Sequence, residues 1–130
     1  MSTPGIEGRL EAARAQIDRV TPEEAWREVE DGAVVVDIRP VSQRETTGEL
    51  PEGPGSVVID RNVLEWRLDP TSGASLPIAS TDLRVLVLCQ QGYASSLAAQ
   101  TLREVGIHRA ADVVGGFDAW LEAGLPVRRP

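Results

Sequence analysis

Cys89, the only cysteine of the sequence, is the residue best placed to do chemistry. It follows the apolar run 85–88 and precedes a loop containing Gly92, and the segment 96–105 beyond has apolar residues at helical spacing. This order predicts a strand, a loop and a helix, with loop N–H groups facing one centre at the start of the helix. The positive end of the helix dipole favours a thiolate there, so the stretch indicates a nucleophilic cysteine.

A buried structural role is the alternative interpretation of Cys89, because a lone cysteine is most often a small hydrophobic residue of the core. Cys89, however, stands at the carboxyl end of its predicted strand, where open α/β sheets bind their ligands. On the residues alone, both interpretations stay open. We expect no metal site, because one cysteine and the single histidine, His108, supply too few ligands. His108 itself is expected to be exposed.

Charged side chains follow two other predicted strands on the same edge of the sheet. Asp37 and Arg39 end the strand 33–38, and we expect Asp37 to fix loop backbone or to pair with an arginine. Arg61 and Arg67 follow the strand 56–60, which is expected to be buried, and are expected to bring positive charge to the pocket. For each arginine, an ordinary surface position or an ion pair is the alternative.

The remaining elements alternate between helices and strands. Residues 1–5 are expected to be disordered, and Thr21, Pro22 and Glu24 form a capping box and first turn that start a helix. Strands alternating with helices, several of them apolar on both sides, predict an α/β fold: an open parallel sheet with helices on both faces. A short N-terminal segment, 1–18, precedes one domain, 19–128. The expected helices are 6–17, 22–29, 41–45, 62–68, 96–105 and 117–123. The expected strands are 33–38, 56–60, 84–88 and 111–114. The three tryptophans, Trp26, Trp66 and Trp120, are expected to pack in the core or at its edge.

Composition limits the possible functions. The sequence has 130 residues, 42% hydrophobic and 25% charged, which suits one globular domain. Its net charge of −7 argues against nucleic-acid binding. No apolar run reaches membrane-spanning length, and residues 1–9 lack the pattern of a signal peptide. A single cysteine forms no internal disulfide, so a cytoplasmic protein is expected; the oligomeric state is left open.

Three segments carry a family pattern: Val35-Val36-Asp37-Ile38-Arg39, then Cys89-Gln90-Gln91-Gly92-Tyr93-Ala94-Ser95-Ser96, and lastly Val114-Gly115-Gly116-Phe117-Asp118-Ala119-Trp120 followed by Gly124-Leu125-Pro126-Val127. In this order and spacing they resemble the single-domain rhodanese family, from about residue 19 to residue 127. The resemblance implies a rhodanese-like fold and sulfurtransferase activity without a cofactor.

The resemblance also implies roles for the loop. Cys89 takes a sulfane sulfur from a small-molecule or protein donor, such as thiosulfate or a persulfide, and passes it to a thiol or to cyanide. The loop residues that bind the substrate are Gln90, Gln91, Gly92, Tyr93, Ala94 and Ser95. Tyr93 either lines the pocket mouth or packs over the loop, and both interpretations stay open. The hydroxyls of Ser95 and Ser96 are expected to cap the helix rather than act as nucleophiles.

Two departures from the family pattern bear on the substrate. Many active members carry a basic residue at the position of Ala94, so its absence favours a persulfide or thiol donor over doubly charged thiosulfate. The usual Gly-His-Ile-Pro-Gly-Ala type of motif appears as Gly48-Glu49-Leu50-Pro51 with extra residues before Gly55-Ser56, without its histidine. This change is expected to alter a surface loop more than the chemistry.

Two other functions compete with sulfur transfer for this loop. The related phosphatases and arsenate reductases of that loop type place an arginine where this sequence has Ser95, and phosphoryl transfer without that guanidinium lacks its main charge clamp. The other rival is a non-catalytic rhodanese-like module that binds a partner or senses sulfur. Such modules usually lose the cysteine, and the retention of Cys89 favours the enzyme.

Overall fold

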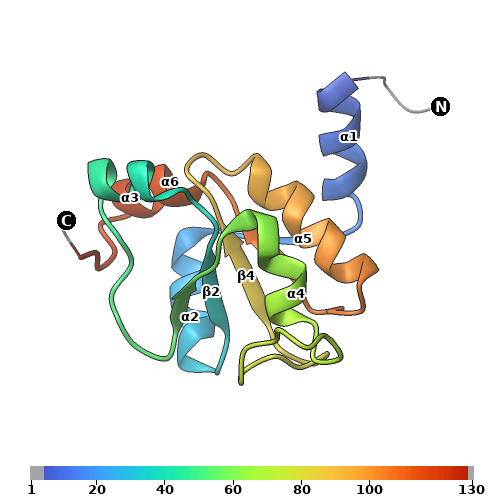
Figure 1. The fold of residues 1–130 in the computed structure, drawn as a ribbon. Helices are drawn as coiled ribbons and strands as arrows, with labels where there is room; N and C mark the ends of the chain where they lie inside the picture. Colours follow the sequence, from blue (N-terminus) through green and yellow to red (C-terminus); the bar gives the residue numbers. More distant parts are fainter. Residues whose placement is uncertain (1–4, 129–130) are drawn as a thin grey trace.

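The computed structural model describes residues 5–128, so the expected disorder of residues 1–5 lies outside that range except at Gly5, which instead begins a helix. Five strands form a single sheet in the order β1-β5-β4-β2-β3, and every neighbouring pair is parallel. The predicted fold class is therefore confirmed (Figure 1). The strands are β1 Asp18–Val20, β2 Val34–Asp37, β3 Ser56–Val58, β4 Val85–Leu88 and β5 Ala111–Val113.

Helices cover both faces of the sheet. α4 and α5 lie on one face, and α2 and α6 lie on the other (Figure 1). α1 packs against the outer side of α5. The helices are α1 Gly5–Arg14, α2 Pro22–Glu30, α3 Val41–Thr47, the 3₁₀ turn η1 Arg61–Val63, α4 Leu64–Leu68, α5 Ala94–Glu104 and α6 Gly116–Glu122.

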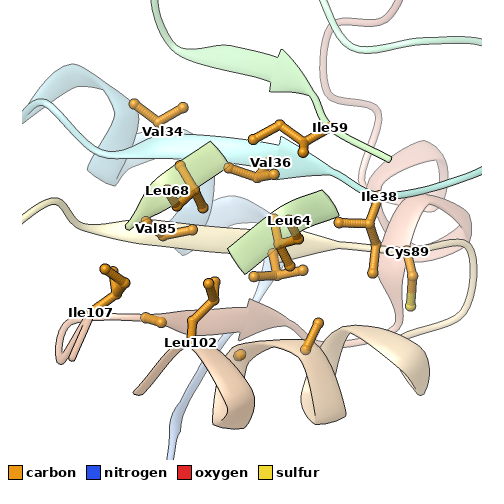
Figure 2. Packing of buried hydrophobic residues seen from close by; sticks show 14 residues of the cluster. Val34, Val36, Ile38, Ile59, Leu64, Leu68, Val85, Cys89, Leu102 and Ile107 are labelled. Carbon is orange, nitrogen blue, oxygen red and sulfur yellow. The ribbon is translucent and has the colours of Figure 1, made fainter. Parts of the chain in front are cut away.

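The core is double because successive side chains of a strand point to opposite faces. Val34 and Val36 of β2 pack under α4 and α5, whereas Val35 packs under α2 and α6. Figure 2 shows the first of these clusters, in which Leu64 and Leu68 of α4 lie over the sheet. All four residues of β4 are fully buried, because this strand lies in the middle of the sheet between β5 and β2.

The local capping signal was predicted correctly. Thr21 accepts a hydrogen bond from the backbone N–H of Glu24, and the Glu24 carboxylate accepts one from the N–H of Thr21. Pro22 occupies the first turn of α2, where its missing N–H needs no partner. His108 is exposed, as predicted, and lies beside Asp82.

Four other predictions were wrong. β1 was missed because only Val20 of its three residues is buried, so it carries no apolar pattern. β3 is not a buried strand, because it forms an edge of the sheet and is half-exposed. Trp66 is 58% exposed on α4 instead of packed. α1 ends at Arg14 rather than at residue 17 because the chain turns into β1.

Within the described part of the chain, no helix combines the length and the apolar character needed to cross a membrane.

Candidate functional site

Cys89 is the first residue after the central strand β4, at the carboxyl edge of the sheet (Figure 2). Its Sγ accepts hydrogen bonds from the backbone N–H of Gly92, at 3.2 Å, and of Ser95, at 3.3 Å. The side chain is largely buried, with 7% of the residue exposed. The loop thus curls around the sulfur and turns backbone donors toward it, an arrangement that stabilises negative charge on sulfur.

Other backbone N–H groups of the loop have no protein acceptor among the described residues. Within residues 5–128, the backbone N–H groups of Gln91, Tyr93 and Ala94 donate to no protein group. They belong to the same short turn as the two donors to Sγ. The loop can therefore offer further backbone hydrogen bonds to an anionic atom added beyond the sulfur.

The start of α6 holds the loop from the other side. Phe117 N–H donates to the Cys89 carbonyl at 2.9 Å, and Asp118 N–H donates to the Gln90 carbonyl at 3.0 Å. Gly116 permits this approach, because a Cβ on it would lie 2.4 Å from the Cys89 carbonyl oxygen. The Gly-Phe-Asp motif of α6 thus fixes the backbone on which the sulfur stands.

Arg39 lies underneath the loop, fully buried. Its guanidinium pairs with Asp37, donates to the Gln90 side chain at 3.0 Å and to the Gly48 carbonyl at 2.9 Å, and stacks 3.9 Å from the centre of the Phe117 ring. Asp37 also accepts from the backbone N–H of Arg39. Asp37 and Arg39 were predicted to support the site. In the structure this pair joins the ends of β2 and β4 to α6.

Asp112 forms a second buried network on the opposite side of the loop. One of its carboxylate oxygens accepts from the hydroxyls of Ser95, at 2.8 Å, and Ser96, at 2.7 Å. Arg19 donates to both oxygens. The prediction that these serines cap α5 was wrong, because the helix begins at Ala94 and their hydroxyls point to Asp112 instead.

An open pocket of about 340 Å³ lies over the sulfur. Its lining contains no Asp, Glu, Lys, Arg or His, and the Tyr93 ring at its mouth is 59% exposed. Ala94 contributes a methyl group and no positive charge to the pocket. The pocket is lined by Gln43, Cys89, Gln90, Gln91, Tyr93 and Ala94.

Two predicted binding residues lie away from this pocket. Arg61 forms an ion pair with Glu65 one turn away, and it lines a separate surface hollow beside Trp66. Arg67 donates to the carbonyl of Ala74 in the following loop. The structure therefore does not bring the two predicted substrate-binding arginines to this pocket, because η1 holds Arg61 against Glu65 and α4 points Arg67 at the loop that follows it.

Sequence reasoning missed the second layer behind the loop, which Arg14, Arg19 and Asp112 form. Only Asp112 leaves a signal: it is a lone acid in a short apolar strand, and a buried carboxylate requires a partner. Arg14 and Arg19 are ordinary arginines in sequence and reach the loop only through the packing of α1 and β1.

Comparisons with known proteins agree with this geometry. The family model for the rhodanese-like domain matches residues 21–123. Thiosulfate sulfurtransferase GlpE from Haemophilus influenzae (strain PittEE) is 29% identical over 108 residues, covering 83% of this chain and 91% of the relative.

Two solved structures are similar over almost the whole chain. A Rhodopseudomonas palustris protein of unknown function, described as a possible tyrosine phosphatase, has a TM-score of 0.85 and 34% identity, covering 98% of this chain and 97% of its own. The polysulfide-sulfur transferase homodimer from Wolinella succinogenes has a TM-score of 0.77 and 26% identity, covering 95% and 87%.

A five-stranded parallel sheet with a cysteine loop at the end of its central strand defines a rhodanese-type α/β protein. The chain belongs to the rhodanese-like domain family. The predicted resemblance is therefore confirmed, and sulfur transfer is supported at the level of the family.

Proposed function

We propose that the protein is a sulfurtransferase that carries a sulfane sulfur on Cys89. The observation that carries this proposal is the convergence of the Gly92 and Ser95 N–H groups on Sγ. Two of the similar proteins described above are named as sulfur transferases. The donor and the thiol acceptor are small molecules or sulfur-carrying proteins, and no metal or organic cofactor is needed.

Sulfur transfer on Cys89 proceeds in two nucleophilic displacements at sulfur. The Cys89 thiolate attacks the outer sulfur of the donor, a new S–S bond forms, and the donor S–S bond breaks. The electron pair leaves with sulfite when the donor is thiosulfate, or with a thiolate when it is a persulfide. An acceptor thiolate, or cyanide in an assay, then attacks the outer sulfur and releases the Cys89 thiolate.

The loop favours the persulfide stage of this cycle. The outer sulfur of a persulfide is anionic, and the N–H groups of Gln91, Tyr93 and Ala94, which donate to no protein group in the described residues, are available as its donors. Because these dipoles are fixed before the reaction, they need no reorganisation when the charge arrives.

The uncharged pocket favours one class of donor. Thiosulfate carries two negative charges, and no arginine of the described residues lines the pocket to pair with them. A thiol persulfide carries one charge on the transferred sulfur, which the backbone donors can hold, and its organic part can lie against the Tyr93 ring. We infer that a low-molecular-weight or protein persulfide is a better donor than thiosulfate.

Phosphate-ester hydrolysis fits the site less well. A cysteine phosphatase of the related loop type needs a guanidinium to hold the transferred phosphoryl group, and the position that would supply it is Ser95. Arg39 cannot substitute, because it is fully buried and its donors already serve Asp37, Thr47, Gln90 and Gly48.

The test is a single-turnover experiment on the intact protein followed by mass spectrometry. Wild-type protein and Cys89→Ser are incubated with a thiol persulfide or with thiosulfate, separated from the donor, weighed, and then given cyanide. We expect the mass of one added sulfur on wild type only, faster loading with the persulfide, and release of thiocyanate. Absence of added sulfur with both donors would remove the enzyme proposal, and cysteine-dependent hydrolysis of an aryl phosphate would replace it with the phosphatase.

A further inference from the structure

The carbonyl of Gly92, on the back of the cysteine loop, receives two guanidinium groups. Arg14 Nη2 donates to it at 2.8 Å, and Arg19 Nη2 donates at 3.1 Å. Arg14 is the last residue of α1, and Arg19 belongs to β1. Both lie before residues 21–123, the part of the chain that matches the family model.

Holding this carbonyl also sets the direction of the next N–H group. The described chain has no cis peptide bond, so the Gly92 carbonyl and the Tyr93 N–H point in opposite directions across one planar group. With the carbonyl fixed by the two arginines, the Tyr93 N–H points away from them, and it donates to no protein group within residues 5–128. The two cations also polarise the peptide, which strengthens the N–H as a donor.

Arg14 makes two further contacts to the same loop. Its Nε donates to the hydroxyl of Ser96 at 3.1 Å, and its guanidinium carbon lies 5.5 Å from the centre of the Tyr93 ring. That distance is within the range of a cation–π contact. Because Tyr93 is more than half exposed, this contact is a restraint on where the ring stands at the pocket mouth.

α1 has its own means of staying docked that do not involve the loop. Arg9 Nη2 donates to the Gln100 side chain of α5 at 3.0 Å, and Gln100 donates to Gln16 at 3.1 Å. Ala13 is fully buried in the contact. Arg14 is therefore available for the loop, and its loss leaves the other contacts between α1 and α5 in place.

From these contacts we infer that α1 is part of the active site and that Arg14 is a positioning residue. It fixes the Gly92–Tyr93 peptide with the N–H outward and holds the Tyr93 ring at the pocket mouth, so that the loop meets the persulfide in one conformation. Ala94 brings no positive charge to the pocket, whereas Arg14 of α1 places a positive charge behind the loop. That charge acts on the pocket by polarising the Gly92–Tyr93 peptide. The effect on catalysis rests on the proposed sulfur transfer, whereas the effect on Tyr93 does not.

The chain offers a matched pair of variants to test this inference. Arg14→Gln and Arg9→Gln each remove one guanidinium and one positive charge from α1, but only the first touches the loop. Tyr93 is the only tyrosine of the sequence, so incorporation of 3-fluorotyrosine gives a single ¹⁹F resonance at the pocket mouth. Sulfur transfer from a thiol persulfide, the ¹⁹F spectrum, the rate of Cys89 alkylation and the urea unfolding midpoint are measured for wild type and both variants.

We expect Arg14→Gln to move the ¹⁹F resonance toward that of free fluorotyrosine and to lower kcat/KM roughly tenfold, the scale of one lost charge-assisted hydrogen bond. Arg9→Gln should match wild type in both, and Arg14→Lys, which keeps the charge and one donor, should lie between. Similar unfolding midpoints for the two glutamine variants separate positioning from general destabilisation.

Identical ¹⁹F spectra and rates for Arg14→Gln and Arg9→Gln would overturn the inference. If wild-type protein transfers no sulfur from any donor, the proposed function fails on its own, and the ¹⁹F shift together with the Cys89 alkylation rate still decides the role of Arg14.

Discussion

Arg39 and Arg84 hold opposite edges of the same sheet with similar chemistry and different surroundings. Arg39 follows β2 at the carboxyl edge, pairs with Asp37, and has no exposed side-chain surface. Arg84 precedes β4 at the amino edge, pairs with Glu28 and Asp18, and donates to the Arg109 carbonyl. Of its two carboxylate partners, Asp18 is 62% exposed and Glu28 is 32% exposed.

The difference shows which ion pairs position the Cys89 loop and which only hold helices and strands together. At the carboxyl edge, buried charges bond to residues of the loop that holds Cys89, so we expect them to act on the position of the sulfur. At the amino edge, Arg84, Glu28 and Asp18 join α2, β1 and β4 near the surface and make no contact with the Cys89 loop. Burial also changes the energetics, because a buried ion that loses its partner remains desolvated, whereas an exposed one is taken up by water.

Removing Arg39 should give the largest effect. Arg39→Met keeps much of the side-chain volume but leaves Asp37 buried and unpaired, which costs about 3–5 kcal/mol in the free energy of unfolding. Sulfur transfer should fall along with it, because Gln90 and the Gly48 carbonyl lose their donor. Urea unfolding and single-turnover loading measure the two effects.

The control for Arg39 is the double variant Asp37→Leu with Arg39→Met. It removes both charges, so much of the stability should return, while the loading rate should stay low because the bonds to Gln90 and Gly48 are still missing. Recovery of the rate together with stability would mean that the pair only stabilises the fold.

Asp112 is the second test of the carboxyl edge, with a smaller expected effect. Asp112→Asn keeps the shape but removes the charge that pairs with Arg19 and turns an amide donor toward the serine hydroxyls. We expect a loss of about 2–3 kcal/mol in stability, because Arg19 is 23% exposed and water can partly solvate it.

Misplacement of the loop in Asp112→Asn should also slow Cys89 loading, by about 10- to 100-fold. Ser95→Ala with Ser96→Ala keeps the Asp112–Arg19 pair and removes only the hydroxyls, so it separates the contribution of the ion pair from that of the loop contacts. A loading rate unchanged in Asp112→Asn would show that this network does not position the sulfur.

The same contrast explains what the sequence could and could not predict. The capping box of α2 and the strand–cysteine–loop–helix order are local patterns, and both were predicted. The stacking of Arg39 on Phe117 and the two arginines on the Gly92 carbonyl join residues far apart in the chain, and no spacing encodes them. Arg61 and Arg67 were misassigned for the same reason, since a strand end predicts the edge of the sheet but not the direction of a side chain.

Arg84 tests the amino edge. Its hydrogen bond to Glu28, with a contribution from Asp18, keeps the pKa of the guanidinium above its usual value although burial opposes this. Arg84→Met should nonetheless cost at most about 1 kcal/mol, because water reaches both carboxylate partners, and such pairs contribute little in water and less in salt. Its loading rate should equal wild type. A rate loss comparable to that of Arg39→Met would erase the distinction between the two edges.

Replacing Glu24 should give the smallest effect. Glu24 is an exposed charge at the carboxyl edge of the sheet, so its variant tests whether burial or location decides which charges act on the site. Hydrogen bonds from the backbone and side chain of Thr21 hold its pKa below the ordinary value of 4.5. A carboxyl whose pKa is lower in the folded state stabilises the fold above its unfolded pKa and loses that contribution as pH falls through the folded one.

Glu24→Gln retains the side-chain acceptor of the capping box but cannot ionise. The wild-type advantage in urea unfolding should therefore be small and constant at neutral pH and should shrink below about pH 4.5. The rate of Cys89 loading should be unchanged at pH 7, because this exposed charge reaches neither buried network. A clear loss of rate would show that location at the carboxyl edge, and not burial, decides which charges act on the site.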